Sequence, residues 1–258
     1  MNVPVVLLHA LATTSAMWCA QTDALRRLGH PVLAPDLRGH GSAPLGTAEP
    51  SLDVLADDLA RALDRHGFGR AVLAGSSMGG YVALAFLRRH PERVSGLALL
   101  GTRATADEPG TAAARLAFAA RIGDPALRPG LLAATTPRLV GATTRATRRA
   151  VLAEVTAMAD AADPAGVAWA QRAIAARPDS VALLRSAAVP AVVIAGAEDE
   201  LVAISEAELM AVALPGGRLV VVPGAGHLTP VEARCAVMAA LTDLIARAAA
   251  RPAMEVSA

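Results

Sequence analysis

The sequence predicts an α/β domain in which helices cover both faces of a mainly parallel, doubly wound sheet, together with a helical cap. Two patterns along the 258 residues indicate this fold class. Short, continuous apolar runs, as expected of strands buried on both faces, alternate with longer helical patterns. One long stretch, residues 103–188, interrupts the alternation without a convincing strand.

The apolar runs are predicted to be the strands of the sheet. They lie at residues 3–8, 31–34, 71–74, 94–100, 191–195 and 219–222. Helices are predicted between and after them, at residues 15–28, 51–66, 78–90, 205–213 and 231–250. Each strand–helix–strand step implies a right-handed crossover, so the sheet is expected to be parallel.

The stretch at residues 103–188 is rich in Ala, Arg and Thr and is punctuated by Pro. Helical patches are predicted within it at residues 111–122, 143–158 and 164–176; the last begins with Asp163 as N-cap and Pro164 at the first helical position. An insertion between two neighbouring strands is expected to form a cap over their carboxyl ends. Residues 1–102 and 189–258 are therefore predicted to form the core, and residues 103–188 the cap.

The composition excludes several classes of protein. Hydrophobic residues make up 54% of the chain and charged residues 18%, which excludes a disordered chain. The formal net charge of +1 argues against a nucleic acid or a membrane surface recognised through bulk charge. A small molecule is the expected partner, and the protein is expected to be a monomer or homodimer with no cofactor and no metal.

A cytoplasmic location is expected. The first residues lack the basic segment of a signal peptide, and the apolar run at residues 3–8 is too short to be one. A second charge-free stretch, residues 71–87, has turn residues at its centre and is not expected to cross a membrane. Cys19 and Cys235 lie far apart in the sequence and are expected to be reduced thiols.

The motif Gly75-Ser76-Ser77-Met78-Gly79 lies directly between a predicted strand and a predicted helix. A nucleophile on such a tight turn has a strained backbone, and the residues two before and two after it must be small. Ser77 meets this requirement with Gly75 and Gly79, whereas Ser76 would have Met78 on one side. The motif therefore predicts Ser77 as a nucleophile at a helix N-terminus, where free N–H groups favour negative charge.

A serine hydroxyl needs a base, and His227 is the predicted one. It ends the Gly-rich loop at residues 223–227, which follows the last strand on the same carboxyl edge as Ser77. A loop histidine with a purely structural hydrogen bond is the alternative. His40 lies in a turn where packing or loop hydrogen bonding is expected. Solvated helix ends are expected for three other histidines, His30, His66 and His90.

An acid is needed to orient the imidazole and to stabilise its protonated form. Asp199 is the predicted acid, in the loop that follows the strand at residues 191–195. Its neighbours Glu198 and Glu200 are expected to be solvated loop carboxylates or first-turn charges of the next helix. The order Ser77, Asp199, His227 along the chain is characteristic of one fold.

With these residues and several further segments, the chain resembles the α/β-hydrolase superfamily over nearly its whole length. The segments are Leu7-Leu8-His9-Ala10-Leu11 with Met17-Trp18, and residues 35–42, 75–80, 90–94, 196–199 and 224–227. Within the superfamily it is most similar to small capped carboxylesterases, enol-lactonases and haloperoxidase-like proteins. The sequence begins at the first predicted strand, so the resemblance implies a six-stranded sheet without the usual N-terminal hairpin, as in plant methylesterase and hydroxynitrile-lyase relatives.

The resemblance also implies an oxyanion hole made by the backbone N–H groups of Leu11 and Met78. The family usually has His-Gly where this chain has His9-Ala10. Because Ala does not readily adopt a positive φ, the oxyanion loop is expected to differ in shape if the family's Gly requires one.

The pattern favours a serine hydrolase that cleaves a carboxylic ester, a methyl ester or a lactone above all, through an acyl-enzyme. Two other uses of the fold stay open. One is non-hydrolytic chemistry in the same pocket, as in a lyase, acyltransferase or perhydrolase, because fold does not determine chemistry. The other is a non-enzymatic ligand receptor. Haloalkane dehalogenation is disfavoured because it needs a carboxylate where Ser77 stands.

The cap is expected to line the acyl pocket. Phe118, Met158 and Trp169 are the bulky candidates, although each is equally compatible with the cap core. Arg103, just after the strand at residues 94–100, is either a contact for a carboxylate substrate or a solvated side chain. Aromatic residues are only 2% of the chain, so the pocket is expected to have aliphatic and small walls. The near-neutral net charge fits a mostly uncharged ester.

Overall fold

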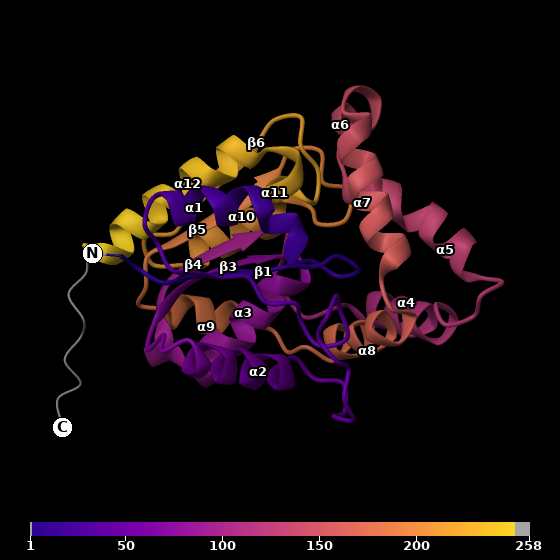
Figure 1. The fold of residues 1–258 in the computed structure, drawn as a ribbon, viewed down its shortest axis with the longest axis horizontal. Coiled ribbons are helices and arrows are strands. Elements are labelled where there is room, and N and C mark those ends of the chain that lie inside the picture. The colour runs from indigo at the N-terminus through magenta and orange to yellow at the C-terminus, as the bar shows by residue number, and fades with distance from the viewer. Residues whose placement is uncertain (1, 251–258) are drawn as a thin grey trace.

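Six parallel strands form one sheet in the order β2-β1-β3-β4-β5-β6 in the computed structural model, which describes residues 2–250 (Figure 1). The strands are β1 (Val5–Leu8), β2 (Val32–Leu33), β3 (Ala71–Ser76), β4 (Val94–Leu100), β5 (Ala191–Gly196) and β6 (Arg218–Val222). Each lies at one of the predicted apolar runs. The predicted fold class, a six-stranded parallel sheet between helices, is confirmed.

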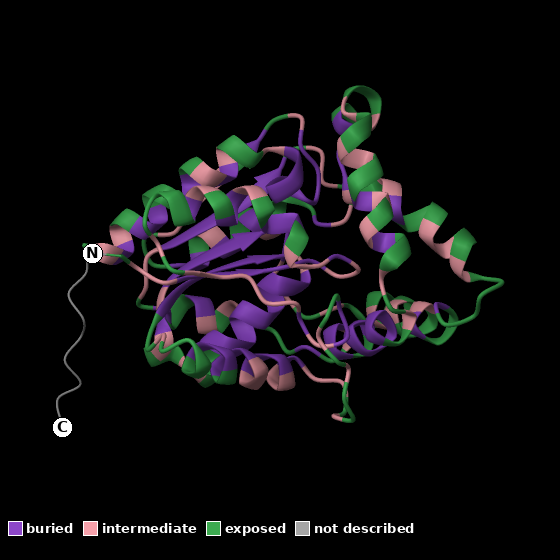
Figure 2. Ribbon diagram, viewed as in Figure 1, coloured by how far each residue is buried: buried purple, intermediate pink, exposed green. Residues whose placement is uncertain are grey.

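Alternate side chains of the strands enter two separate apolar layers. In β1, Val5 and Leu7 face one layer, while Val6 and Leu8 face the other. The first layer is covered by α1 (Cys19–Arg27), α11 (Thr229–Glu232) and α12 (Arg234–Ala249). The second is covered by α2 (Leu52–Arg65), α3 (Met78–Arg89), α9 (Val181–Ser186) and α10 (Ile204–Ala213). Figure 2 shows the buried sheet between partly exposed helices.

Five helices lie beyond the carboxyl ends of the strands, at the right of Figure 1. We refer to them as the cap helices. They are α4 (Pro109–Arg121), α5 (Arg128–Thr135), α6 (Ala142–Thr147), α7 (Arg149–Ala161) and α8 (Pro164–Ala175). α4 packs against α8, whereas α5 has no buried residue. The later helix α9 lies inside the predicted insertion but packs on the core beside α10.

The helical patches predicted in the insertion correspond to α4, α6 with α7, and α8. The patch at residues 143–158 is interrupted at Arg148, whose backbone (φ −121°, ψ 57°) leaves the helical region. α5 and α9 were not predicted, because both are short. Three short 3₁₀ helices complete the structure: η1 (Ser15–Trp18), η2 (Pro91–Arg93) and η3 (Thr136–Leu139).

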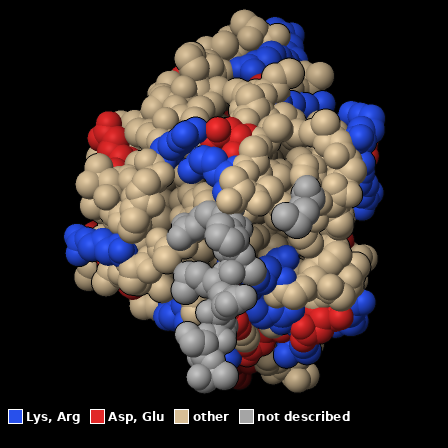
Figure 3. Space-filling view, turned by 90° about the vertical axis from the view of Figure 1, so that its left-hand side faces the viewer, with Lys and Arg blue, Asp and Glu red and all other residues tan. Residues whose placement is uncertain are grey.

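The face opposite the cap helices, at the amino ends of the strands, has basic and acidic side chains scattered over it (Figure 3). Within the described part of the chain, no helix combines the length and the hydropathy needed to span a bilayer. Cys19 and Cys235 are both free thiols and both exposed.

Candidate active site

Ser77 occupies a sharp turn between β3 and α3. Its φ is +50° and its ψ is −111°, a conformation that side chains rarely adopt. A Cβ on Gly75 would overlap the carbonyl group of Gly79, and a Cβ on Gly79 would overlap the carbonyl group of Leu8. The two glycines therefore allow β3, α3 and β1 to approach closely enough to form the turn. Ser76, by contrast, is fully buried within β3.

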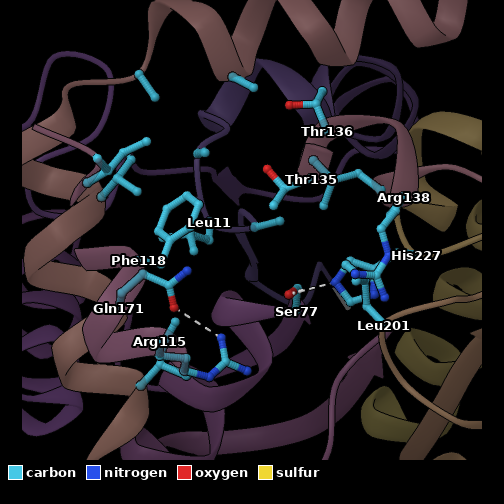
Figure 4. A pocket seen from close by; sticks show the side chains of 18 of the residues that line it. Leu11, Ser77, Arg115, Phe118, Thr135, Thr136, Arg138, Gln171, Leu201 and His227 are labelled. Carbon is cyan, nitrogen blue, oxygen red and sulfur yellow. Dashed lines mark hydrogen bonds between the residues drawn. The ribbon is translucent and has the colours of Figure 1, made fainter. Parts of the chain in front are cut away.

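The side chains of Ser77, His227 and Asp199 form a chain of hydrogen bonds. The Ser77 hydroxyl donates to His227 Nε2 over 2.8 Å, drawn as a dashed line in Figure 4. His227 Nδ1 donates to Asp199 Oδ2 over 2.9 Å. The three residues follow the carboxyl ends of β3, β6 and β5, and both His227 and Asp199 are 4% exposed in their side chains. The parallel sheet thus brings together residues that are far apart in sequence.

Asp199 is held in its ionised form. Burial alone would raise its pKa, but the hydrogen bond from His227 and the backbone N–H groups of Leu201 and Val202 outweigh it, so the pKa lies below its ordinary value. A carboxylate only accepts hydrogen bonds, so Nδ1 of His227 must carry a hydrogen. Nε2 is then left as an acceptor for the Ser77 proton. This arrangement can generate an alkoxide nucleophile.

Leu11 and Met78, the residues whose N–H groups the resemblance assigns to an oxyanion hole, flank this arrangement. Met78 is the first residue of α3, and Leu11 lies in the loop after β1 and lines the cavity described below. The residue of this loop with positive φ is Ala12 (+57°), not Ala10. Ala10 therefore fits its position without backbone strain, and the replacement of the usual Gly demands no change there.

His9 stabilises the same loop through two hydrogen bonds. Its Nδ1 donates to the carbonyl group of Ala10 over 2.8 Å, and its Nε2 accepts from the N–H of Leu37 over 2.8 Å. Burial, with a smaller contribution from nearby His40, lowers the pKa of His9 to about 3. His9 is therefore a neutral bridge between the loops after β1 and β2. His40, expected to be a packing or loop residue, is buried beside it.

A cavity of about 440 Å³ lies at Ser77 and His227, and side chains from the cap helices form part of its wall. Its wall is mainly aliphatic, with Ile122, Leu132 and Val167 among the side chains from the cap. Apart from His227, the only aromatic rings among the described lining residues are Tyr81 and Phe118. The prediction of a pocket poor in rings is confirmed.

Two of the four expected pocket residues lie elsewhere. Phe118 and Arg103 line the cavity, but Met158 and Trp169 do not. Trp169 is 6% exposed and belongs to the apolar layer covered by α2 and α3. Its Nε1 donates to the carbonyl group of Ala48 over 2.7 Å. Met158 packs against the other core layer, and the nearby residues Ala159 and Ala162 line the cavity instead. Both bulky residues fix the cap to the core.

Several lining residues were not predicted, notably Tyr81, Arg115 and Gln171. Arg115 and Gln171 come from the two paired helices α4 and α8 and are joined by a hydrogen bond of 3.1 Å (Figure 4). Only the packing of the two helices determines that both face the cavity. Tyr81 had a detectable signal, since it lies in the first turn of the helix that directly follows Ser77. No cluster of three metal-binding side chains occurs within residues 2–250.

Comparisons with known proteins show the family to which the chain belongs. The model of the α/β-hydrolase fold family matches residues 3–233. The pimeloyl-[acyl-carrier protein] methyl ester esterase of Aromatoleum aromaticum is 34% identical over 241 residues, 88% of this chain and 92% of the relative. Matches to two further curated relatives span only 36% and 18% of their lengths.

Two solved structures are similar over almost the whole chain. A thermophilic esterase from Thermogutta terrifontis, solved with malate bound, is 35% identical with a TM-score of 0.91 and covers 96% of this chain and 91% of its own. The enol-lactonase from Burkholderia xenovorans LB400 is 29% identical with a TM-score of 0.85 and covers 95% of this chain and 92% of its own.

Proposed function

Because the chain belongs to the α/β-hydrolase fold family, we propose that it is a serine hydrolase that cleaves carboxylic esters or lactones. One observation carries the proposal: the hydrogen-bonded chain of Ser77, His227 and Asp199 opens into a cavity large enough for a small ester. The methyl ester esterase and the enol-lactonase among its relatives support a methyl ester or a lactone as the substrate.

In this proposal Ser77 Oγ attacks the acyl carbon while His227 Nε2 takes its proton. The Asp199 carboxylate stabilises the imidazolium that results. The N–H groups of Leu11 and Met78 stabilise the oxyanion of the tetrahedral intermediate, the largest single contribution expected in such a site. His227 then protonates the leaving alkoxide, which leaves an acyl-enzyme on Ser77. A water molecule, activated by His227, releases the acid by the same steps.

The test compares two neighbouring serines. Ser77→Ala is expected to abolish the hydrolysis of p-nitrophenyl and methyl esters, and to abolish labelling by a fluorophosphonate probe. Ser76→Ala is the matched control, because the Ser76 hydroxyl is buried without a hydrogen-bond partner in the described chain. A Ser77→Ala variant with full esterase activity would overturn the proposal. Product analysis with added alcohol, peroxide or cyanide separates hydrolysis from acyl transfer, perhydrolysis and lyase chemistry.

A further inference from the structure

The cavity wall contains more positive than negative charge. Among the described residues that line it, no aspartate or glutamate occurs. The basic side chains of the lining are Arg103, Arg115, Arg128 and Arg138. The near-neutral charge of the whole chain conceals this local excess, because the acidic side chains lie outside the cavity.

One carboxylate behind the wall is shared between two arginines. Asp107, whose side chain is fully buried, accepts from Arg115 Nε over 2.6 Å and from Arg177 Nη2 over 2.8 Å. One negative charge therefore serves two guanidinium groups, and the cluster keeps a net charge of about +1. Arg115 is the member of this cluster that lines the cavity.

Arg103 has less compensation still. Its guanidinium donates to the carbonyl oxygen of Leu201 over 2.8 Å, and its Nε is buried without any acceptor among residues 2–250. It forms no ion pair within this range. Arg103 as a whole is half-buried, and a partly desolvated cation without a counter-charge is costly, so an anion that enters the cavity would reduce an existing penalty.

Both arginines line the same cavity as the proposed nucleophile. Arg103 directly follows Thr102, whose hydroxyl donates to the carbonyl oxygen of Ser77 over 2.9 Å. Figure 4 shows Arg115 beside Gln171, among the side chains that line the cavity with Ser77. Tyr81 also lines the cavity, and the Arg177 guanidinium lies over its ring at 4.3 Å from the centroid. Packed side chains therefore hold this part of the wall in place.

We propose that Arg103 and Arg115 form a subsite for a carboxylate on the acyl part of the substrate. The natural substrate is then an anionic ester: a monoester of a dicarboxylic acid, or a lactone with a free carboxylate. This inference rests on the proposed hydrolase function and assigns its substrate class. Guanidinium groups suit the role because their planar N–H donors match a carboxylate.

The first experiment compares esters of equal chain length. Monomethyl adipate and methyl hexanoate have the same six-carbon acyl chain and differ in a terminal carboxylate against a methyl group. Methanol release is expected to give a higher kcat/KM for monomethyl adipate. Dimethyl adipate, in which a second methyl ester replaces the carboxylate and removes its charge, is expected to behave like methyl hexanoate. A preference for the neutral esters would overturn the subsite.

Substitution of Arg103 tests the residue itself. Arg103→Gln is expected to lower kcat/KM for monomethyl adipate by roughly 10- to 100-fold, the loss typical of a charged hydrogen bond, with much less effect on methyl hexanoate. Arg103→Lys keeps the charge and is expected to restore part of the activity. Arg218→Gln is the matched control, since Arg218 is exposed at the start of β6. An equal loss on both esters in Arg103→Gln would contradict the subsite.

Binding measured without turnover separates this inference from the proposed function. In a Ser77→Ala background, calorimetry is expected to detect binding of monomethyl adipate that Arg103→Gln weakens by a similar factor. If the wild type hydrolyses neither ester but this Arg103-dependent binding is present, the subsite stands and the hydrolase proposal fails. If binding is absent or independent of Arg103, the subsite is wrong, whatever the hydrolytic activity.

Discussion

Ser77 combines a strained backbone with two flanking positions that tolerate no side chain. The sequence motif requires small residues at 75 and 79 for a general steric reason. The structure shows which atoms a larger side chain would overlap. For Gly79 the obstacle is the carbonyl group of Leu8, in the neighbouring strand β1. The glycine therefore belongs to the packing of α3 on the sheet as much as to the turn, which makes it a separate test of the elbow.

Gly79→Ala should destabilise the protein although Ala is the better helix former by about 1 kcal/mol. We expect a loss of about 2 kcal/mol or more in the free energy of unfolding, because the overlap is with backbone that cannot move alone. Activity should fall with it, since α3 and Ser77 must shift. Gly110→Ala in α4 is the control, because its Cβ would meet open space. Urea denaturation measures both; equal effects would contradict the steric argument.

His9 is a second residue whose role depends on its surroundings. Burial keeps it neutral, with Nδ1 as donor and Nε2 as acceptor, and these two hydrogen bonds join the loops after β1 and β2. The folded pKa of about 3 lies below the ordinary value of 6.5. Below pH 6.5 the unfolded chain therefore binds a proton that the folded chain does not, and acid favours unfolding.

The stability of the protein should accordingly decrease as the pH falls from 6.5 toward 3, by up to roughly 1.4 kcal/mol per pH unit from His9 alone. Urea denaturation at pH 6.5 and pH 5 measures this slope. His9→Gln removes the titration and should flatten the slope, while buried His40, whose pKa is also lowered by burial, keeps part of it. The exposed His66→Gln serves as control. An unchanged slope in His9→Gln would refute this role.

At the scale of elements, one buried carboxylate joins the cap to the loop that ends at His227. Glu232, in α11, accepts from the N–H of Gly226 over 2.9 Å through one oxygen. Its other oxygen accepts from the N–H of Gly141 over 2.8 Å and the hydroxyl of Thr144 over 2.7 Å, at the start of α6. The Glu232 side chain therefore positions both the start of α6 and the loop that carries His227, the proposed general base.

Glu232→Gln should be costly, because the amide nitrogen would face N–H donors at one of these positions. We expect a loss of about 1–3 kcal/mol in the free energy of unfolding and a lower kcat, with KM less affected, because His227 is displaced. Glu154→Gln is the control, since Glu154 forms an exposed ion pair with Arg234. Hydrolysis rates and denaturation curves of both variants test these two expectations. A normal kcat in a destabilised Glu232→Gln would show a purely structural role.

At the scale of the whole molecule, the sequence predicts the features that depend on where the strands lie and where they end. Ser77, Asp199 and His227 each follow an apolar run, and a parallel sheet must bring such ends to one edge. The hydrogen-bonded chain of these residues could be anticipated for that reason. Their chemical roles stay predictions until the variants are measured.

The cap could not be predicted to the same depth. Its helices are Ala-rich, so their sequences do little to distinguish the face toward the core from the face toward the cavity. For Trp169 the sequence is compatible with both the pocket and the core, and the structure places it in the core; Arg115 and Gln171, for which the sequence gives no signal, line the cavity. The charge excess of the cavity likewise depends on which arginines find carboxylates, which only the packed structure reveals.

The same weak patterning implies that the cap is unevenly stable. α5 has no buried residue, yet Leu132 and Thr135 within it line the cavity, whereas α3 is buried along most of its length. Amide hydrogens of α5 should therefore exchange much faster than those of α3, because few contacts oppose local opening.

A ligand that fills the cavity would add contacts to α5. Hydrogen exchange of Ser77→Ala with and without monomethyl adipate should show protection concentrated in α5 and η3, with α2 as an internal control. Exchange in α5 as slow as in α3, or ligand protection confined to α3, would mean that the cavity wall is already rigid before a substrate arrives.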